Sequence, residues 1–292
     1  MELIFQQIAA GLATGAIYAC VALAIVMIYR AIGHVNFAQG EMAMASTYIA
    51  WQLIELGLPY WLAFALTVAL SFVLGAAVQH LLIRRIRNAS EINQIIVFIG
   101  LMLVFNSAAG FIWNYTVKPF PSPFGTAPFM GSTLASAHQV GMAGVVLVVL
   151  VFLFLFFRFT RTGLAMRAAV SNPNSARLLG IRVKALEALG WGMAASIGAV
   201  AGILVAPIVF LEPNMMAGIV IYGFAGAVLG GLNSLLGALV GGLLLGVLEN
   251  LISTFVPVVG GELKSTIALI TIVIVLLIRP QGLIGKLTTH RV

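Results

Sequence analysis

Residues 140–184 read VGMAGVVLVVLVFLFLFFRFTRTGLAMRAAVSNPNSARLLGIRVK, an apolar run followed by a basic segment without an acidic residue. The run, 140–157, carries no charge and, at 1.5 Å per helical residue, crosses most of the roughly 30 Å hydrocarbon core of a bilayer. The segment after it, 158–184, carries six Lys and Arg residues. Because these residues collect in cytoplasmic loops, the stretch predicts a membrane-spanning helix that emerges on the inner side.

The composition of the whole chain also indicates a membrane protein. Of its 292 residues, 62% are apolar and 8% are charged, whereas about 25% of the residues in a typical soluble domain are charged. The net charge of +7 would suit nucleic acid, but the long uncharged stretches favour a bilayer, so we expect no nucleic-acid partner. The single cysteine, Cys20, excludes a disulfide framework and a multi-cysteine metal site.

Nine apolar runs approach the length of a membrane span, which predicts one all-α domain over 1–292, a polytopic transmembrane helical bundle. A topology with the amino terminus outside, nine crossings and the carboxyl terminus inside agrees with the positive-inside rule. In this topology, only Lys118 and Lys264 of the 15 Lys and Arg residues lie outside. If the second run, 38–55, enters the membrane and returns to the same side, the chain crosses eight times. Eight and nine crossings both stay open. The runs cover residues 8–28, 38–55, 61–83, 92–117, 140–157, 186–211, 215–232, 235–256 and 263–278.

Two long connections lie between these runs. The outer one, 118–139, carries four prolines and is expected to form an irregular periplasmic loop. In the inner one, 158–184, Asn172 and Pro173 are typical of a helix start and Gly180 of a helix end. We expect Ala176 and Leu179 to share one face of a short amphipathic helix on the cytoplasmic surface, where it can dock to a soluble partner. Positive-inside bias and attraction to anionic lipid are the simpler explanation of the charge.

Glycine spacing predicts close helix packing, because several glycine pairs lie four residues apart. The stretch 223–246 differs, since Gly230, Gly231, Asn233 and Ser234 interrupt its apolar run. Broken helices at membrane depth are tolerated where they face protein or a water-filled cavity, so this break is expected to border a translocation pathway.

Acidic residues within the runs are costly in a membrane and are therefore candidate site residues. Asn36 and Gln39 suggest a capping-box-like helix start, which would place Glu41 near a favourable helix dipole. Glu249 has two open interpretations: it snorkels or pairs with a neighbouring donor, or it lines a pathway.

The motifs that the chain lacks narrow its function. It has no G-x-x-x-x-G-K-[ST] phosphate loop, no H-E-x-x-H and no G-x-S-x-G, so we expect neither ATP hydrolysis nor an intramembrane enzyme in this chain. With no Asp it supplies few relay groups for a proton- or sodium-coupled carrier. Transport driven by energy from another subunit therefore fits the sequence better than ion-coupled transport.

Four stretches resemble the permease subunits of branched-chain amino acid ABC importers, of the LivH type. Residues 33–41, GHVNFAQGE, resemble the family's G-x-x-N-F-A-x-G-E turn, and 162–168 with Ala176 and 179–181 resemble its cytoplasmic coupling segment. Residues 229–238 resemble L-G-G-x-G-S-x-x-G-A, with Asn233 in place of a glycine, and 279–283 resemble the R-P-Q-G-L ending.

The resemblance implies a multi-pass subunit of the bacterial inner membrane with its carboxyl terminus inside. It implies a second homologous permease, two ATP-binding-cassette subunits that carry ATP and Mg, a periplasmic solute-binding protein and surrounding lipid, with no cofactor or metal in this chain. The implied solutes are branched-chain amino acids, and similar importers carry urea, amides or aromatic acids. An ion-coupled secondary carrier is the more distant alternative.

The residues that would serve this function fall in two sets. The expected coupling residues in the cytoplasmic coupling loop are Gly163, Arg167, Asn172, Pro173, Ala176, Leu179 and Gly180. The expected pathway residues are Asn36, Gly40, Glu41, Gly230, Gly231, Asn233, Ser234 and Glu249.

Overall fold

The structure is a computed structural model that describes residues 2–32, 35–86, 89–125, 127–128, 136–256 and 264–285. Regular structure in these ranges is helical, apart from two isolated bridges that join Lys118 to Leu211 and Pro128 to Ser136. This confirms the predicted all-α class. The elements are α1 (Glu2–Ile32), α2 (Gln39–Glu55), α3 (Tyr60–Val78), η1 (Gln79–Ile83), α4 (Arg84–Ile86), α5 (Glu91–Trp113), α6 (Ala137–Phe159), α7 (Arg161–Ser171), α8 (Pro173–Leu178), α9 (Val183–Val209), α10 (Ala217–Gly230), α11 (Leu235–Phe255) and α12 (Lys264–Ile278).

Some of the predictions fall on residues outside the described ranges. These are Gly33 and His34 of the first motif, residues 126 and 129–135 of the expected outer loop, Leu263 of the last run, and the basic residues Arg87, Lys286 and Arg291.

Six helices in the described ranges are long and apolar enough to cross a membrane. They are Leu3–Arg30, Tyr60–Ile86, Ile92–Trp113, Ala137–Phe159, Val183–Val209 and Leu235–Phe255. The other three predicted runs form the shorter helices α2, α10 and α12, which have 17, 14 and 15 residues. The number of span-length helices is therefore smaller than the number of apolar runs.

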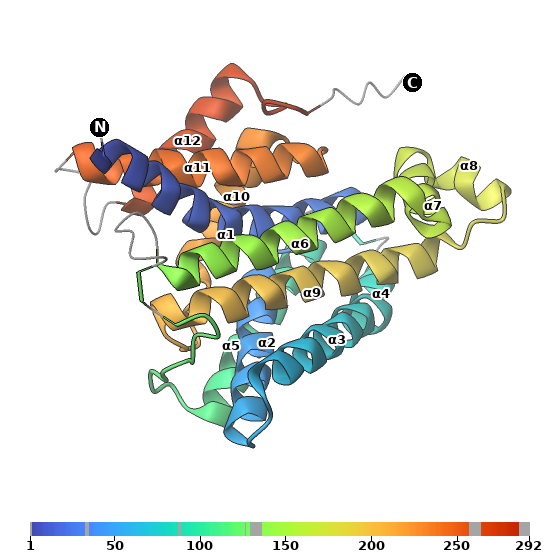
Figure 1. Cartoon of the computed structure of the whole chain (residues 1–292). Coiled ribbons are helices and arrows are strands. Elements are labelled where there is room, and N and C mark those ends of the chain that lie inside the picture. The colour runs from blue at the N-terminus through green and yellow to red at the C-terminus, as the bar shows by residue number, and fades with distance from the viewer. Residues whose placement is uncertain are drawn as a thin grey trace.

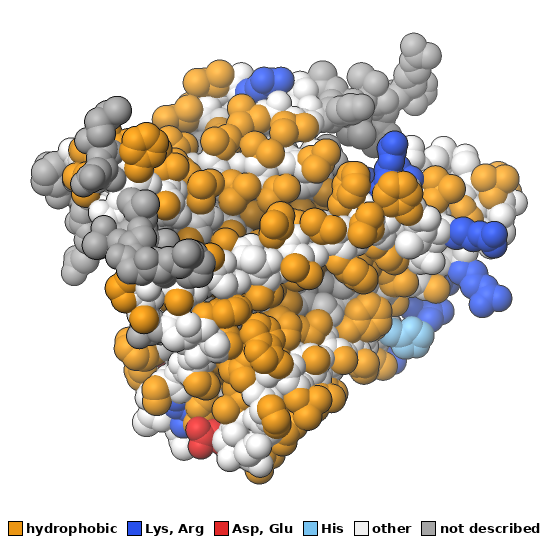
Figure 2. Space-filling model, viewed as in Figure 1, with side chains coloured by type: hydrophobic (Ala, Val, Ile, Leu, Met, Phe, Trp, Pro, Cys, Tyr) orange, Lys and Arg blue, Asp and Glu red, His pale blue; other side chains and the backbone are white. Residues whose placement is uncertain are grey.

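Helices α1 and α9 form the centre of the bundle. Both are largely buried, and α1 packs against α6, α9, α10 and α11. Figure 1 shows α1, α6, α9 and α11 running across the view, with α2 crossing them steeply and α7 and α8 projecting at one end. Figure 2 shows apolar side chains over the long helices and a group of Lys and Arg side chains toward the end with α7 and α8. The outer faces of the long helices suit lipid, because they are apolar and exposed.

Local sequence accounts for several helix ends. Ser136 forms a capping box with Gln139: its Oγ accepts from the Gln139 N–H at 3.2 Å, and its own N–H donates to Gln139 Oε1 at 2.9 Å. Thr160 caps α7 by accepting from the Gly163 N–H at 2.9 Å. These caps satisfy backbone groups that a helix start leaves without a partner.

Glycines provide the close approach of α1 and α11 that their spacing predicts. A Cβ at Gly15 would lie 2.8 Å from the Leu243 carbonyl oxygen, and one at Gly11 would lie 2.7 Å from Val247 Cα. Gly246 meets the backbone of Gly15 from the opposite side. Since a β-carbon at these positions would push the two backbones apart, the small residues set the distance between the helices.

Candidate functional site

The start of α2 holds three of the expected pathway residues. Asn36 is buried, and its Oδ1 accepts from the Ala38 N–H at 3.0 Å. The expected capping box with Gln39 is wrong: Ala38 is the N-cap, and Gln39 Nε2 donates instead to the Ala194 carbonyl of α9 at 3.1 Å. The glutamine is held by tertiary packing, which the local motif could not reveal.

Gly40 and Glu41 connect α2 to other helices. A Cβ at Gly40 would meet the Val220 side chain of α10, so α10 lies directly against this turn. Glu41 Oε2 accepts from Asn106 Nδ2 of α5 at 3.3 Å. Asn106 Nδ2 also lies 3.0 Å from the Pro213 carbonyl and 3.1 Å from Asn214 Oδ1. One amide therefore joins α2, α5 and the turn before α10, a role that the sequence did not indicate.

Glu249 lies in a second polar group, between α1, α10 and α11. It is 6% exposed, and its Oε2 accepts from the Tyr18 hydroxyl at 2.7 Å. The Tyr18 ring stacks on Tyr222 with 4.7 Å between ring centroids. The structure therefore supports pairing with a neighbouring donor rather than snorkelling.

The predicted break between α10 and α11 lies at Gly231–Ser234. Gly231 has φ +107°, and Ser234 Oγ caps α11 by accepting from the Gly237 N–H at 3.0 Å. The Leu283 N–H donates to the Leu229 carbonyl at 2.8 Å, so the break packs against the residues after α12. Asn233 is exposed. The stretches 229–238 and 279–283, two of the four that carry the family resemblance, therefore pack against each other.

The expected coupling segment forms α7 and α8. Asn172 Oδ1 accepts from the Ser175 N–H at 3.0 Å, Pro173 takes the first helical position, and Gly180 ends the segment with φ +78°. These three predictions of local structure are confirmed. Gly163 lies against the backbone of Phe156, so α7 folds back closely on the end of α6.

The expected shared face of Ala176 and Leu179 is wrong. Ala176 is buried and packs with Ala169 and Val183 in a small cluster. Leu179 is 80% exposed and its neighbour Leu178 is 89% exposed. The two leucines lie at the end of α8, before the chain turns at Gly180 and returns to the buried cluster through Ile181 and Val183.

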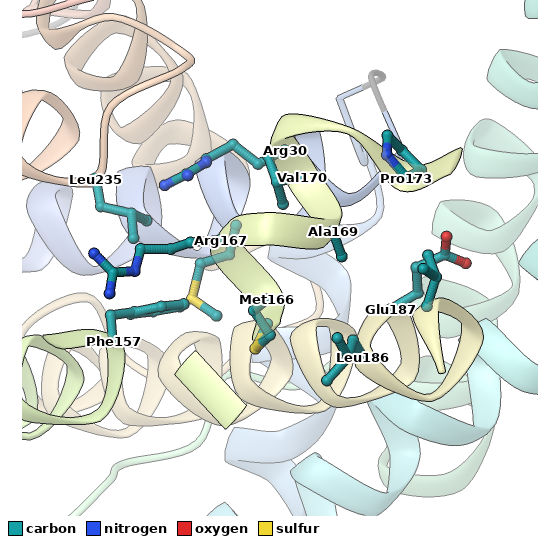
Figure 3. A pocket seen from close by; sticks show the side chains of 12 residues that line it. Arg30, Phe157, Met166, Arg167, Ala169, Val170, Pro173, Leu186, Glu187 and Leu235 are labelled. Carbon is teal, nitrogen blue, oxygen red and sulfur yellow. The ribbon is translucent and has the colours of Figure 1, made fainter. Parts of the chain in front are cut away.

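Arg167 lies in a pocket between α1, α7, α9 and α11, which we call the arginine pocket. Its lining includes Arg30, Met166, Arg167, Glu187 and Leu235. Figure 3 shows both guanidinium groups directed toward Leu235, with Glu187 on the other side of the pocket.

Glu187 was missed in the sequence, although an acidic residue inside a predicted span is the signal that identified Glu249. It is 8% exposed, and its Oε2 lies 3.5 Å from Gln79 Nε2. Within the described ranges, the structure has no group of three His, Cys, Asp or Glu side chains that could hold a metal ion.

The family described as "Branched-chain amino acid transport system / permease component" matches residues 7–276. The chain is 30% identical to the high-affinity branched-chain amino acid transport system permease protein LivH of Salmonella typhimurium (strain LT2), over 98% of this chain and 97% of the relative. It is 31% identical to the permease protein BraD of Pseudomonas aeruginosa, again over 98% and 97% of the two chains.

Among solved structures, the chain is similar in fold to one described as PsaBC from Streptococcus pneumoniae in complex with Fab. The TM-score is 0.50 and the sequence identity 15%, over 93% of this chain and 91% of that chain. At this identity the likeness concerns the fold alone.

Proposed function

Because the chain belongs to the family of permease components of branched-chain amino acid transport systems, we propose that it is the transmembrane subunit of a binding-protein-dependent ABC importer. It works in the bacterial inner membrane beside a second, homologous permease. A periplasmic solute-binding protein delivers the solute, and two cytoplasmic ATP-binding-cassette subunits bind ATP and Mg. This chain holds no cofactor and moves the solute by alternating access.

The observation that carries this proposal is the shape of the α7–α8 segment. Both helix starts are capped, and the buried cluster of Ala169, Ala176 and Val183 fixes the segment to the bundle. Leu178 and Leu179 are exposed at the end of α8. Figure 2 shows a group of Lys and Arg side chains toward the end of the molecule where α8 lies. A rigid element with an exposed apolar tip can dock into a soluble partner and transmit its movement to α6 and α9, which it connects.

The contacts of α2 support nine passages through the membrane. Trp113 Nε1, at the end of α5, donates to Gln52 Oε1 at 3.0 Å, and Lys118 lies 4.7 Å from the centroid of the Trp51 ring. The end of α2 therefore lies on the same side as the end of α5, opposite to Arg30. In our proposal, residues 33–55 cross the membrane as an irregular turn and a short helix, and the carboxyl terminus lies inside.

The solute path is proposed to run beside the two short helices α2 and α10. Their starts place the irregular segments 35–38 and 210–216 and the Glu41–Asn106 hydrogen bond within the bundle. Discontinuous helices with polar groups at their ends are typical of transport pathways. The Tyr18–Glu249 pair and the Gly230–Ser234 break lie farther along α10 and are proposed to border the same path.

Branched-chain amino acids are the proposed solutes, because the relatives LivH and BraD are described as permeases for them. The alternatives within the same architecture are urea, amides and aromatic acids. The binding protein that co-purifies with the complex decides between them: retention of leucine, isoleucine or valine supports the first class, and retention of urea or an aromatic acid contradicts it.

The docking role is tested with Leu178→Glu and Leu179→Glu. Each should reduce co-purification of the ATPase subunits and uptake of the retained solute by more than tenfold, because a charge in a desolvated apolar contact costs several kcal/mol. Ala185→Glu places the same charge at an exposed position on α9 and serves as the control. Normal co-purification in both leucine variants would contradict docking through α8. Uptake by liposomes that hold this chain alone, driven by an ion gradient, would instead support a secondary carrier.

A further inference from the structure

A groove runs along the lipid-facing side of α6 and α11 and ends at the arginine pocket. Its lining includes Leu23, Leu147, Val151 and Leu239, and its end includes Arg158 and Arg167. The volume of this groove is about 450 Å³. Phe157, Arg167 and Leu235 line both the groove and the arginine pocket, so the two form one continuous depression.

The groove has the length of one membrane leaflet. Leu147 and Arg158 mark its ends on α6, and at 1.5 Å per residue they lie about 16 Å apart along the helix axis. This is about half of the roughly 30 Å hydrocarbon core. A chain that lies in the groove from Leu147 therefore reaches the arginines at the depth where a phospholipid carries its phosphate.

The arginine pocket is lined by two positive charges, Arg30 and Arg167, and by one acidic residue, Glu187. Neither Arg30 nor Arg167 forms an ion pair with another described residue, and their two positive charges act on each other across the pocket. Glu187 lies on the opposite side, near Gln79 (Figure 3). Arg30 is half-buried and Arg167 is exposed at the edge of the pocket. Two neighbouring cations beside an apolar groove favour an anion with several acceptor oxygens, since Arg binds phosphate through a planar fork.

We propose that this depression binds one anionic phospholipid of the cytoplasmic leaflet. An acyl chain lies in the groove between α6 and α11, and the phosphate accepts hydrogen bonds from Arg30 and Arg167, with Arg158 at the rim. The lipid would join α1, α6, α7 and α11 at the point where α7 leaves the bundle. The site is independent of the solute, although the leaflet rests on the orientation proposed above.

Other occupants fit the observations less well. The arginine pocket alone has a volume of about 80 Å³ and the groove about 450 Å³, so the apolar groove must take most of a ligand. A second permease chain would bury the arginines in an apolar contact, and the cores of protein interfaces are depleted in charge. One lipid molecule fits both the apolar groove, with its acyl chain, and the arginine pocket, with its phosphate.

The test titrates the delipidated full-length chain in mild detergent with phosphatidylglycerol or phosphatidylcholine and counts bound lipids by native mass spectrometry. Arg30→Gln and Arg167→Gln should each weaken phosphatidylglycerol binding about tenfold, through loss of one charge-assisted contact. Val151→Trp, which fills the groove, should weaken it similarly without any change in charge. Arg167→Lys should restore part of the affinity.

Arg161→Gln is the matched control. Arg161 lies on the same helix, α7, is exposed and lines neither the groove nor the pocket. Its variant should bind phosphatidylglycerol as the wild type does. Gel filtration and thermal unfolding of every variant separate loss of the site from loss of the fold.

Four outcomes would overturn the inference. Equal affinity for phosphatidylcholine would remove the role of the anionic head group. Normal binding by Val151→Trp, with displacement by inorganic phosphate, would indicate an anion site without a lipid chain. Displacement by free leucine would indicate a solute site. Crosslinking of Val151→Cys to another permease chain would make the groove a protein interface. None of these readouts requires transport, so failure of the importer proposal is a separate result.

Discussion

At the residue scale, the structure shows which polar side chains inside the bundle have partners. Glu41 accepts from Asn106, and Glu249 accepts from Tyr18. Both acidic residues stand out in the sequence because charged groups are rare in apolar runs. Their donors do not, since an asparagine and a tyrosine within a helix indicate nothing about a partner 65 or 231 residues away.

Tyr18→Phe should lower stability because it leaves the buried Glu249 without this donor. We expect a loss of about 1–3 kcal/mol, the cost of removing one partner of a buried hydrogen bond, measured as resistance to unfolding in detergent. Tyr222→Phe keeps the stacked ring and the Tyr18–Glu249 bond, so its effect should be smaller. Both variants keep the stacked rings, so equal losses would contradict a specific contribution of the Tyr18–Glu249 hydrogen bond.

At the element scale, glycines determine how closely the helices approach. Gly11, Gly15 and Gly246 lie where α1 and α11 meet, whereas a Cβ at Gly144 of α6 would meet nothing within 4 Å. Spacing of four residues identifies a helical face in the sequence, but it does not identify the helix on the other side.

Gly15→Ala should destabilise the bundle by about 1–3 kcal/mol, because its β-carbon would lie 2.8 Å from a backbone oxygen that cannot move independently. Gly144→Ala should change stability by less than about 1 kcal/mol, in the favourable direction, since alanine is the better helix former. Thermal unfolding of the two purified variants compares them directly. A similar midpoint for both would contradict the role assigned to the α1–α11 contact.

The end of α8 provides a second prediction at this scale. Gly180 has φ +78°, a conformation that costs an alanine about 1–2 kcal/mol. Gly180→Ala should displace Leu178 and Leu179 and lower the uptake per ATP hydrolysed in the assembled importer, while the amount of chain in the membrane stays the same. Ser175→Ala keeps the backbone N–H that Asn172 caps, and it should behave as the wild type. Unchanged coupling in Gly180→Ala would show that the tip tolerates a shift.

At the scale of the whole molecule, the direction of the chain through the membrane connects the fold to the proposed function. The contacts of α2 with Trp113 and Lys118 place residues 56–59 beside the end of α5. The α7–α8 segment lies at the other end, near Arg30.

Single cysteines test this arrangement. Cys20 is fully buried, so the wild type provides the unlabelled background for a membrane-impermeant maleimide. Leu56→Cys and Thr116→Cys should react in intact cells and Ser175→Cys only in inside-out vesicles. Labelling of Leu56→Cys from the inner side alone would exclude the crossing through α2. Labelling of Ser175→Cys from outside would exclude coupling through α8.

Sequence alone determined the features that depend on neighbouring residues and on the solvent. Apolar runs and the distribution of arginines predict the helices and the membrane, and Asn172, Pro173 and Gly180 define α8, because caps and φ preferences act within a few residues. Tertiary structure decided the rest. It directed the side chain of Gln39 to the backbone of α9 rather than to a helix cap, and it separated Leu179 from Ala176. It also paired Glu249 with Tyr18 and brought Arg30 and Arg167 together. These contacts join distant segments through packing, and periodicity in one helix carries no information about the surface that it meets.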